Sequence, residues 1–178
     1  MARLDPQALV THLDRLYRVA WALCGSREEA EDLVQETAAR VLARPRQLRG
    51  QDELAYLVRA LRNTFLLSRR TASRRPREVA TLEQAEPVDV RASGGLGPEA
   101  AVEARELFAA IAALPDDFRL ALVAVDVAGL SYQEAASLLD TREATIASRL
   151  YRARERVART LTPAPGGGEG NAAPRSLR

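Results

Sequence analysis

The stretch SYQEAASLLDTREATIASRLYRARERV, residues 131–157, decides the fold of the part of the chain that contains it. Ser131 and Glu134 form an S-x-x-E capping box, which predicts the start of a short helix. Residues 140–142 then turn the chain, and a longer helix is expected from Glu143 to about Leu161. A short capped helix, a tight turn and a second, longer helix are typical of a helix-turn-helix motif.

The second helix of this motif has two faces of opposite character. One face repeats apolar side chains at helical spacing and should pack inward, whereas the other face has guanidinium and hydroxyl groups. Arg can read guanine in the major groove of DNA, and Ser or Thr can contact bases or phosphates. A helical hairpin with a solvated basic face is the alternative interpretation. The inward residues are Ile146, Leu150, Ala153 and Val157, and the candidate DNA-binding residues are Thr145, Ser148, Arg149, Arg152 and Arg156.

The sequence on either side of this motif also favours helices. Apolar residues make up 47% of the 178 residues and aromatic residues only 4%, so the core should consist mostly of Leu, Ala and Val. Apolar residues recur at helical spacing from Leu9 to Cys24, after a second capping box at Ser26, and from about Glu53 to Arg74. We therefore predict an all-α fold.

Pro and Gly residues interrupt the helical pattern between residues 77 and 98, where acidic residues also outnumber basic ones. The tail from residue 163 is rich in Pro, Gly and Ala, which predicts disorder. We therefore predict two small helical domains joined by a flexible acidic linker, the second of them a helix-turn-helix domain. The expected segments are a first domain at 1–76, the linker at 77–98, the second domain at 99–162 and the tail at 163–178.

Charge alternates along the chain, although the formal net charge is only +2. Seven Arg and no acidic residue lie between Arg59 and Arg77, and six Arg with two Glu lie between Arg142 and Arg159. Seven acidic residues and two Arg lie between Glu78 and Glu106, which follow the first basic stretch. Each basic helix can neutralise phosphates, although a solvated charged face is the usual alternative. We hypothesise that the acidic linker covers the basic helices in the free protein.

The helix expected at 53–74 carries polar groups on the side away from its Leu-rich stripe. An aromatic ring, an amide and several Arg on one face suit unstacked bases and their phosphates together. The alternative is a solvated helix with a half-buried Tyr. The residues on this face are Tyr56, Arg59, Arg62, Asn63, Leu66, Arg69 and Arg70.

The helix that starts after Ser26 has an acidic outward face formed by Glu28, Asp32, Gln35 and Glu36. Three interpretations are open: a solvated face, a protein-docking face, or a metal or acid–base site. The last needs further ligands, which the sequence does not offer. We expect no catalytic residue, no metal and no cofactor.

Cys24 is the single cysteine and His12 the single histidine, so neither an intramolecular disulfide nor a His-based metal cluster is expected. No apolar run approaches the length of about 20 residues that a membrane span needs, and the beginning of the sequence lacks a signal-peptide pattern. We therefore expect a cytoplasmic protein that does not insert into a membrane.

Four motifs occur in an order that is similar to one known family. They are AEDLVQET (30–37), AYLVRALRNTFLLSRR (55–70), LPDDFR (114–119) and GLSYQEAASLLDTREATIASRLYRAR (129–154). Over about residues 8–160 the chain resembles the extracytoplasmic-function (ECF) class of bacterial sigma factors. The resemblance implies a transcription initiation factor, not an enzyme, that binds core RNA polymerase at the clamp of the largest subunit and at the flap, and directs it to promoter DNA.

The resemblance also implies roles for individual positions. The helix with Glu28, Asp32, Gln35 and Glu36 looks like the core-docking helix. The loop of Leu48, Arg49, Gly50 and Gln51 is similar to the loop that captures a base flipped out of the minus-ten element. Asn63 and the Arg near it match the helix that binds this element as it melts, and Ser148 and Arg149 match an S-R-L signature in the helix that reads the minus-thirty-five element. The acidic linker resembles the segment that threads toward the RNA exit path.

The sequence departs from the family pattern at a few positions. Tyr56 stands where Trp is usual, Leu67 where Asp is frequent, and Ala144 and Ala147 replace a usual Gly and a basic residue. These departures leave the promoter sequence open. Family members are commonly inhibited by an anti-sigma factor, which is an expected partner, and NTFLLSRR (63–70) is also similar to a stress-responsive branch. The competing functional hypothesis is a stand-alone helix-turn-helix regulator that binds DNA without polymerase.

Overall fold

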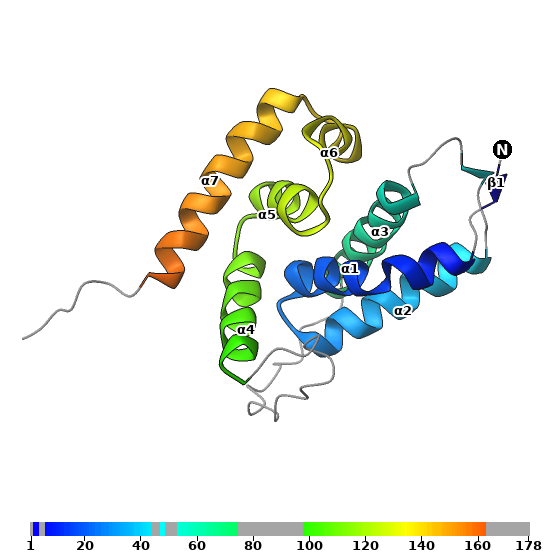
Figure 1. The fold of residues 1–178 in the computed structure, drawn as a ribbon, viewed down its shortest axis with the longest axis horizontal. Coiled ribbons are helices and arrows are strands. Elements are labelled where there is room, and N and C mark those ends of the chain that lie inside the picture. Colours follow the sequence, from blue (N-terminus) through cyan, green and yellow to red (C-terminus); the bar gives the residue numbers. More distant parts are fainter. Residues whose placement is uncertain (1, 4–5, 44–46, 49–52, 75–97, 163–178) are drawn as a thin grey trace, which may run out of the picture.

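The computed structural model describes residues 2–3, 6–43, 47–48, 53–74 and 98–162 of the chain (Figure 1). Most of the predicted linker, the predicted tail, and Arg49 and Gly50 of the predicted base-capturing loop lie outside the described residues. Helices dominate the described part, which confirms the all-α prediction. A pair of two-residue strands, which the sequence did not predict, is added at one end: β1 (Ala2–Arg3) pairs antiparallel with β2 (Gln47–Leu48).

The first half of the chain forms three helices, α1 (Pro6–Cys24), α2 (Arg27–Ala43) and α3 (Glu53–Arg74). The bounds of α3 agree with the prediction, whereas α1 begins three residues before the predicted Leu9. Gly25 separates α1 from α2 with a φ of +83°, a left-handed conformation that favours glycine. The hydroxyl of Ser26 then accepts a hydrogen bond from the backbone N–H of Glu29, so the predicted cap starts α2.

The second half forms α4 (Pro98–Ala112), α5 (Asp116–Leu122), α6 (Tyr132–Leu139) and α7 (Glu143–Leu161). The helix-turn-helix lies at α6 and α7, where it was predicted, and α7 has the predicted bounds. A π-helical turn, η2 (Val123–Val127), extends α5. In this turn the N–H of Ala128 donates to the carbonyl of Val123, five residues earlier.

The predicted capping box at the start of α6 is complete. The backbone N–H of Glu134 donates to Ser131 Oγ (3.2 Å), and the backbone N–H of Ser131 donates to Glu134 Oε2 (2.7 Å). Ser131 Oγ also donates to Glu134 Oε2 (2.6 Å). The hydrogen bonds that this carboxylate accepts, first from the Ser131 hydroxyl and then from the Ser131 backbone N–H, hold the pKa of Glu134 below its ordinary value. At the other end of α6, Asp140 adopts the left-handed conformation (φ 51°) and turns the chain toward α7.

We expect Glu134→Ala to lower the stability of the protein in a pH-dependent way. Because the folded-state pKa of Glu134 is depressed, its contribution is present above the ordinary Glu pKa of about 4.3 and is lost as the pH falls through the lower folded-state value. The free energy of unfolding should therefore fall by about 1 kcal/mol at pH 7, and the difference from the native protein should shrink below about pH 4. Urea unfolding at several pH values measures both.

Gln133→Ala is the matched control for this prediction, because Gln133 is the exposed neighbour of Glu134 and does not titrate. Its effect on the free energy of unfolding should be small and independent of pH. An effect of Glu134→Ala that stays constant from pH 7 to pH 3 would contradict the assignment of the charged capping box.

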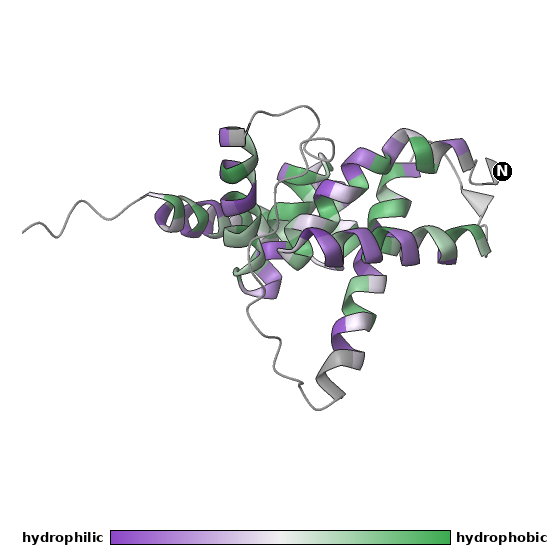
Figure 2. Cartoon of the chain, turned by 90° about the horizontal axis from the view of Figure 1, so that it is seen from below, coloured by the Kyte–Doolittle hydropathy of each residue, from purple (hydrophilic) through white to green (hydrophobic). Residues whose placement is uncertain are grey.

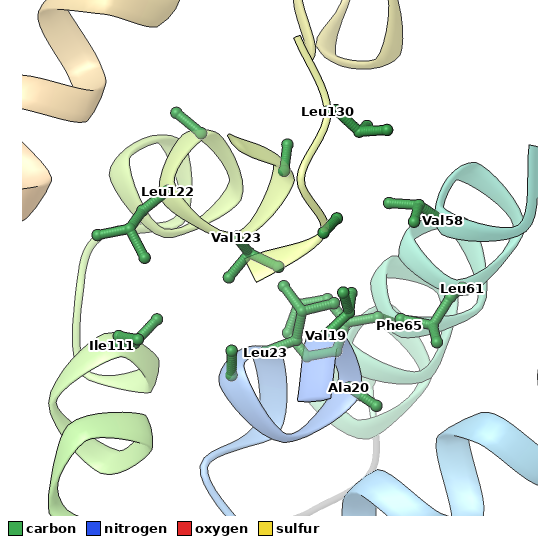
Figure 3. Close-up of a cluster of buried hydrophobic side chains, with 14 of the residues drawn as sticks. Val19, Ala20, Leu23, Val58, Leu61, Phe65, Ile111, Leu122, Val123 and Leu130 are labelled. Atoms are coloured by element: carbon green, nitrogen blue, oxygen red, sulfur yellow. The ribbon is translucent and has the colours of Figure 1, made fainter. Parts of the chain in front are cut away.

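The two halves of the chain pack against each other, and the buried residues of both form one hydrophobic cluster. Helix α1 contacts α2 and α3 of its own half and also α4 and η2 of the other half. Val19 and Leu23 of α1 point toward Val123 of η2, and Ile111 of α4 lies nearby (Figure 3). Hydrophobic residues gather where the helices meet, while hydrophilic residues follow their outer sides (Figure 2). This packing between the halves was not predicted from the sequence.

No helix in the described part of the chain is both long enough and apolar enough to span a membrane.

Candidate nucleic-acid and polymerase interfaces

A groove of about 670 Å³ lies between α2 and α3. Its floor and walls combine apolar side chains with an aromatic ring, an amide and three Arg, and none of the described residues that line it is acidic. Apolar, aromatic, amide and cationic groups on one open surface suit unstacked bases and their phosphates together. The lining residues are Arg40, Val41, Tyr56, Ala60, Arg62, Asn63, Thr64, Leu66, Leu67 and Arg70.

Arg62 lines this groove with a partly buried guanidinium. Its partial burial, and secondarily the nearby charge of Arg59, lower the pKa of its guanidinium below the ordinary value. One of its amino groups donates a weak hydrogen bond to Asn63 Oδ1 (3.4 Å), while its buried Nε has no hydrogen-bond partner. A dehydrated guanidinium with unused donor capacity binds an anion or an acceptor atom more favourably than a fully hydrated one.

The structure separates the predicted α3 residues into two groups. Tyr56, Arg62, Asn63, Leu66 and Arg70 line the α2–α3 groove as predicted for a single binding face. Arg59 and Arg69 instead extend toward the other half of the chain. Arg59 donates to the carbonyl of Ser137 in α6 (3.2 Å), and Arg69 forms an ion pair with Asp116 in α5 (2.8 Å). Leu48 lies in β2, at the end of the described part of its loop.

Arg40 is a groove residue that the sequence did not reveal. It lies on α2, one turn after Glu36, with which it forms an exposed ion pair of 2.7 Å. The sequence assigned only an acidic face to α2, because the approach of α3 to this end of the helix depends on tertiary packing. The i,i+4 spacing from Glu36 could have indicated the pair itself, but not that Arg40 borders a groove.

The predicted acidic face of α2 is exposed as expected. Its four members, Glu28, Asp32, Gln35 and Glu36, lie opposite the buried stripe that packs α2 against α1 and α3. Among the described residues, no group of three or more His, Cys, Asp and Glu side chains is placed to hold a metal ion. A face of exposed carboxylates without an accompanying cleft suits a protein partner with basic groups.

Helix α7 has the two predicted faces. Ile146, Leu150, Ala153 and Val157 are buried against the rest of the second half, and the predicted DNA-binding residues lie on the more accessible side. Side chains of α5 contact two of these DNA-binding candidates. Arg149 donates to Asp117 Oδ2 (2.7 Å), and the guanidinium of Arg156 lies 4.8 Å from the centre of the Phe118 ring. Ser148 and Arg152 are exposed, and Thr145 is half-buried.

Two further features of α7 were missed. Tyr151 is 71% exposed, which is unusual for an aromatic side chain and places a stacking or hydrogen-bonding group beside Ser148 and Arg152. Arg154 belongs to the basic stretch but donates two hydrogen bonds to Asp126, of 2.6 and 2.9 Å. Its charge is therefore paired with a carboxylate of the same half of the chain. Its position around the helix, about 200° from Arg152, could have indicated this difference.

Two protein-family models match the chain, one in each half. Sigma-70 region 2 matches residues 9–75, and Sigma-70, region 4 matches residues 104–157. The separate matches confirm the predicted division into two helical domains, although the residue limits proposed for each domain remain predictions.

Curated bacterial proteins are similar to the chain. The ECF RNA polymerase sigma factor EcfG of Rhodopseudomonas palustris is 36% identical, and the alignment covers 80% of this chain and 76% of EcfG. The ECF RNA polymerase sigma factor SigE of Mycolicibacterium smegmatis is 33% identical over 82% of this chain. The match spans only 57% of the length of SigE.

A solved structure has the same arrangement of helices. It is the sigma factor RpoE of Bartonella quintana in complex with the anti-sigma factor NepR, with a TM-score of 0.64 and 26% identity, and the match covers 87% of this chain and 94% of that one. A sigma factor of known structure therefore has a fold similar to the one described above.

Proposed function

Because the chain belongs to the extracytoplasmic-function class of bacterial sigma factors, we propose that it binds core RNA polymerase, directs the enzyme to specific promoters and helps to melt the DNA there. The observation that carries this proposal is the presence of accessible Arg side chains on one face of α3 and on one face of α7, each in a half that matches a different sigma region. The polymerase performs the chemistry and this chain supplies no catalytic residue. It acts in the cytoplasm, with the chromosome.

The acidic face of α2 is proposed as the surface that docks on the clamp of the largest polymerase subunit. Glu28, Asp32, Gln35 and Glu36 are all exposed and adjacent, so they can meet a basic surface without rearrangement of the helix. The second half would contact the flap. An anti-sigma factor is a further proposed partner, in line with the complex in which the Bartonella sigma factor was solved.

The α2–α3 groove is proposed to bind the minus-ten element as it becomes single-stranded. A base that leaves the duplex needs an apolar surface or an aromatic ring on which to stack, and its phosphate needs a cation. Tyr56 and Leu66 supply the first kind of surface, and Arg62 supplies a cation that is already partly dehydrated. Asn63 presents an amide for hydrogen bonds to a base edge. The loop of Leu48, Arg49 and Gly50 is proposed to capture a base that flips out of the minus-ten element.

The exposed face of α7 is proposed to read the minus-thirty-five element in the major groove. Ser148 and Arg152 are accessible, and Asp117 fixes the direction of the Arg149 side chain before DNA binds. The remaining members, Thr145 and Arg156, flank them. A stand-alone helix-turn-helix regulator would not need the groove on α3, and the match of residues 9–75 to a sigma region gives that alternative no support.

Transcription with purified components tests the proposal directly. The full chain is mixed with bacterial core polymerase and a library of promoter fragments, and new transcripts are sequenced. Specific initiation that depends on the chain is expected. Tight DNA binding by the chain without any association with core polymerase would contradict the proposal.

We expect Arg40→Ala to weaken promoter melting by removing a cation that contacts a phosphate. Loss of one phosphate contact should lower affinity about equally for different promoter sequences and reduce the slope of log affinity against log salt by about 1. Permanganate footprinting of unpaired thymines measures melting as a function of salt. Arg18→Ala is the matched control, because Arg18 is an exposed Arg of α1 that does not line this groove. A salt slope that is equal in the two variants would exclude Arg40 from the site.

A further inference from the structure

A second groove, of about 640 Å³, lies where α1 meets α4, η2 and α7. It shares no lining residue with the α2–α3 groove. The acidic face of α2 and the proposed DNA-binding face of α7 also contribute no residue to it. The proposed function therefore leaves this junction groove without a role.

Aliphatic and aromatic side chains form most of the wall of the junction groove. Ile111 of α4 and Leu122 of α5, both labelled in Figure 3, belong to it. None of the described residues that line the groove has an amide or hydroxyl side chain. A base or a sugar would lose hydrogen bonds to water on such a wall, whereas a hydrocarbon chain has none to lose. The larger apolar residues are Leu107, Phe108, Ile111, Leu122, Val127 and Val157.

The charged side chains of the groove fall into two groups. Arg154 donates two hydrogen bonds to Asp126, so these two charges offset each other. Arg15 and Arg18, one turn apart on the exposed side of α1, form no hydrogen bond or ion pair with any other described residue, and we call them the α1 cation pair. The guanidinium of Arg15 lies at the groove, because a Cβ atom on Gly129 would be 3.9 Å from Arg15 Nη1.

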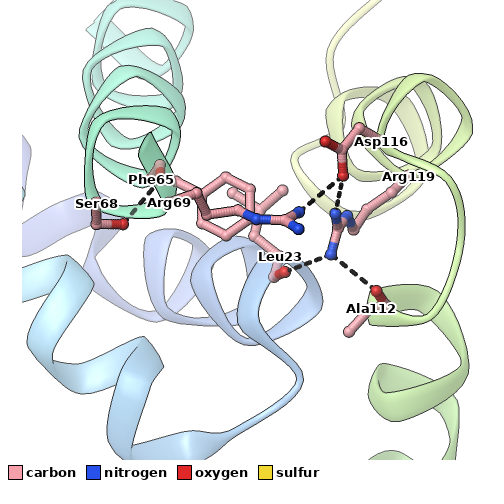
Figure 4. A network of polar contacts seen from close by, with 7 residues as sticks. All are labelled: Leu23, Phe65, Ser68, Arg69, Ala112, Asp116 and Arg119. Carbon is pink, nitrogen blue, oxygen red and sulfur yellow. Dashed lines mark hydrogen bonds and ion pairs between the residues drawn. The ribbon is translucent and has the colours of Figure 1, made fainter. Parts of the chain in front are cut away.

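Cations elsewhere between the two halves have partners within the fold. Near the end of α1, Arg119 donates to the carbonyl oxygens of Leu23 (3.0 Å) and Ala112 (2.8 Å; Figure 4). It also pairs with Asp116, which accepts a second hydrogen bond from Arg69 (2.8 Å). The α1 cation pair has no such carboxylate, although an apolar wall lies beside it. Two cations at the edge of an apolar groove are complementary to a ligand that is both apolar and anionic.

We propose that the junction groove binds a free single-chain amphiphile with an anionic head, of which a fatty acid is the simplest example. The hydrocarbon chain lies along Phe108 and the aliphatic wall, and the carboxylate accepts hydrogen bonds from Arg15 and Arg18. The volume of the groove falls within the range of about 300–1,000 Å³ that small-ligand sites have. This proposal does not rest on the proposed function, because it involves none of the residues assigned to polymerase or promoter DNA.

Trp21, the single tryptophan of the chain, reports occupancy of the groove without a label. The centre of its ring lies 4.6 Å from that of Phe108, which lines the groove. Dodecanoate, titrated below its micelle-forming concentration into the full chain, should therefore change the tryptophan fluorescence in a saturable way. Octanoate should bind at least about tenfold more weakly, because each buried CH₂ group tightens binding up to about fourfold. Dodecyltrimethylammonium, with the same chain and a cationic head, should also bind at least about tenfold more weakly.

Ala158→Phe tests the location of the site, and Ala109→Phe is the matched control. Both alanines are exposed on helices, but only Ala158 lines the groove. The ring introduced at position 158 should occupy the groove and abolish dodecanoate binding, whereas Ala109→Phe should bind as the native chain does. Circular dichroism and urea unfolding show whether each variant is folded. If the two folded variants bind dodecanoate equally, the ligand lies elsewhere and the proposal is wrong.

The double variant Arg15→Glu, Arg18→Glu tests the assignment of the anionic head. Arg142→Glu makes the same change of charge at an exposed position outside the groove and is the control. Because each exposed ion pair contributes up to about fivefold in affinity, the double variant should bind dodecanoate at least about tenfold more weakly. It should also bind dodecyltrimethylammonium more tightly than the native chain does. An unchanged preference for the anionic amphiphile would contradict the role of the α1 cation pair.

Two other occupants of the groove would give different results. Binding to vesicles of phosphatidylglycerol that Ala158→Phe abolishes, without any binding of dodecanoate, would assign the groove to a membrane surface. Binding of an acidic amphipathic peptide, again without dodecanoate, would assign it to a protein partner. Either result overturns the proposal. Initiation by the native chain is measured without any amphiphile, so a failure of the proposed function and a failure of this inference are read from separate assays.

Discussion

Asp32→Arg is expected to abolish binding to core RNA polymerase, with a loss of affinity of at least about 100-fold, while the protein stays folded. Asp32 lies at the centre of the acidic face of α2, between Glu28 and Glu36 on the same side of the helix. Reversing its charge removes an attraction to a basic partner surface and also places a like charge against it. Because the side chain is exposed and packs against no core residue, the free energy of unfolding should change by less than about 0.5 kcal/mol.

Glu103→Arg makes the same change of charge on an exposed position of α4 and serves as the control. Co-migration of chain and core polymerase on a sizing column, and fluorescence anisotropy at several salt concentrations, measure the affinity of each variant. Glu103→Arg should bind as the native chain does. If both variants lose affinity equally, net charge rather than the α2 face determines docking.

Leu150→Ala should have the largest effect on stability, about 2–5 kcal/mol. Leu150 is 1% exposed and lies on the inward stripe of α7, between Ile146 and Ala153. The shortened side chain leaves a cavity that the close-packed helices α5 and α7 cannot fill. Since α7 also carries the proposed minus-thirty-five face, we expect sequence-specific promoter binding to be lost together with stability at 37 °C.

Tyr151→Ala removes a larger side chain from the next position and is the control for Leu150→Ala. Tyr151 is 71% exposed, so the free energy of unfolding should change little. Urea unfolding of both variants gives the comparison. Should Tyr151→Ala destabilise the protein as much as Leu150→Ala, the assignment of inward and outward faces on α7 would be wrong.

Local signals in the sequence predicted those helices that have capping residues, terminal glycines or a clear apolar spacing of their own. Ser131 and Glu134 cap α6, Gly25 and Gly129 end helices with positive φ, and the bounds of α3 and α7 follow from apolar spacing. Each of these features depends on residues within a few positions of one another. The four motifs that resemble the sigma family also predicted the order of the two domains along the chain.

The features that the sequence did not predict all depend on residues that are far apart in the sequence. Arg59 meets Ser137 at a separation of 78 positions, and Arg119 meets Leu23 at a separation of 96. No spacing rule connects such pairs, so the sequence assigned Arg59 to the same face as Asn63 and gave Arg119 no special role. Arg40 was missed for a related reason, because the groove beside it exists only where α2 and α3 meet.

The π-helical turn η2 affects the orientation of α6 and α7, and with them the proposed DNA-binding face. A hydrogen bond that spans five residues instead of four accommodates one extra residue at Val123–Val127. One residue of helix corresponds to a rotation of about 100°. Deleting a single residue there would leave α6 and α7 with all of their own side chains, yet would turn the outward row of α7 by about a quarter of a revolution. The direction in which the proposed DNA-binding face of α7 points is therefore set by the number of residues in η2, a segment that lies outside that face.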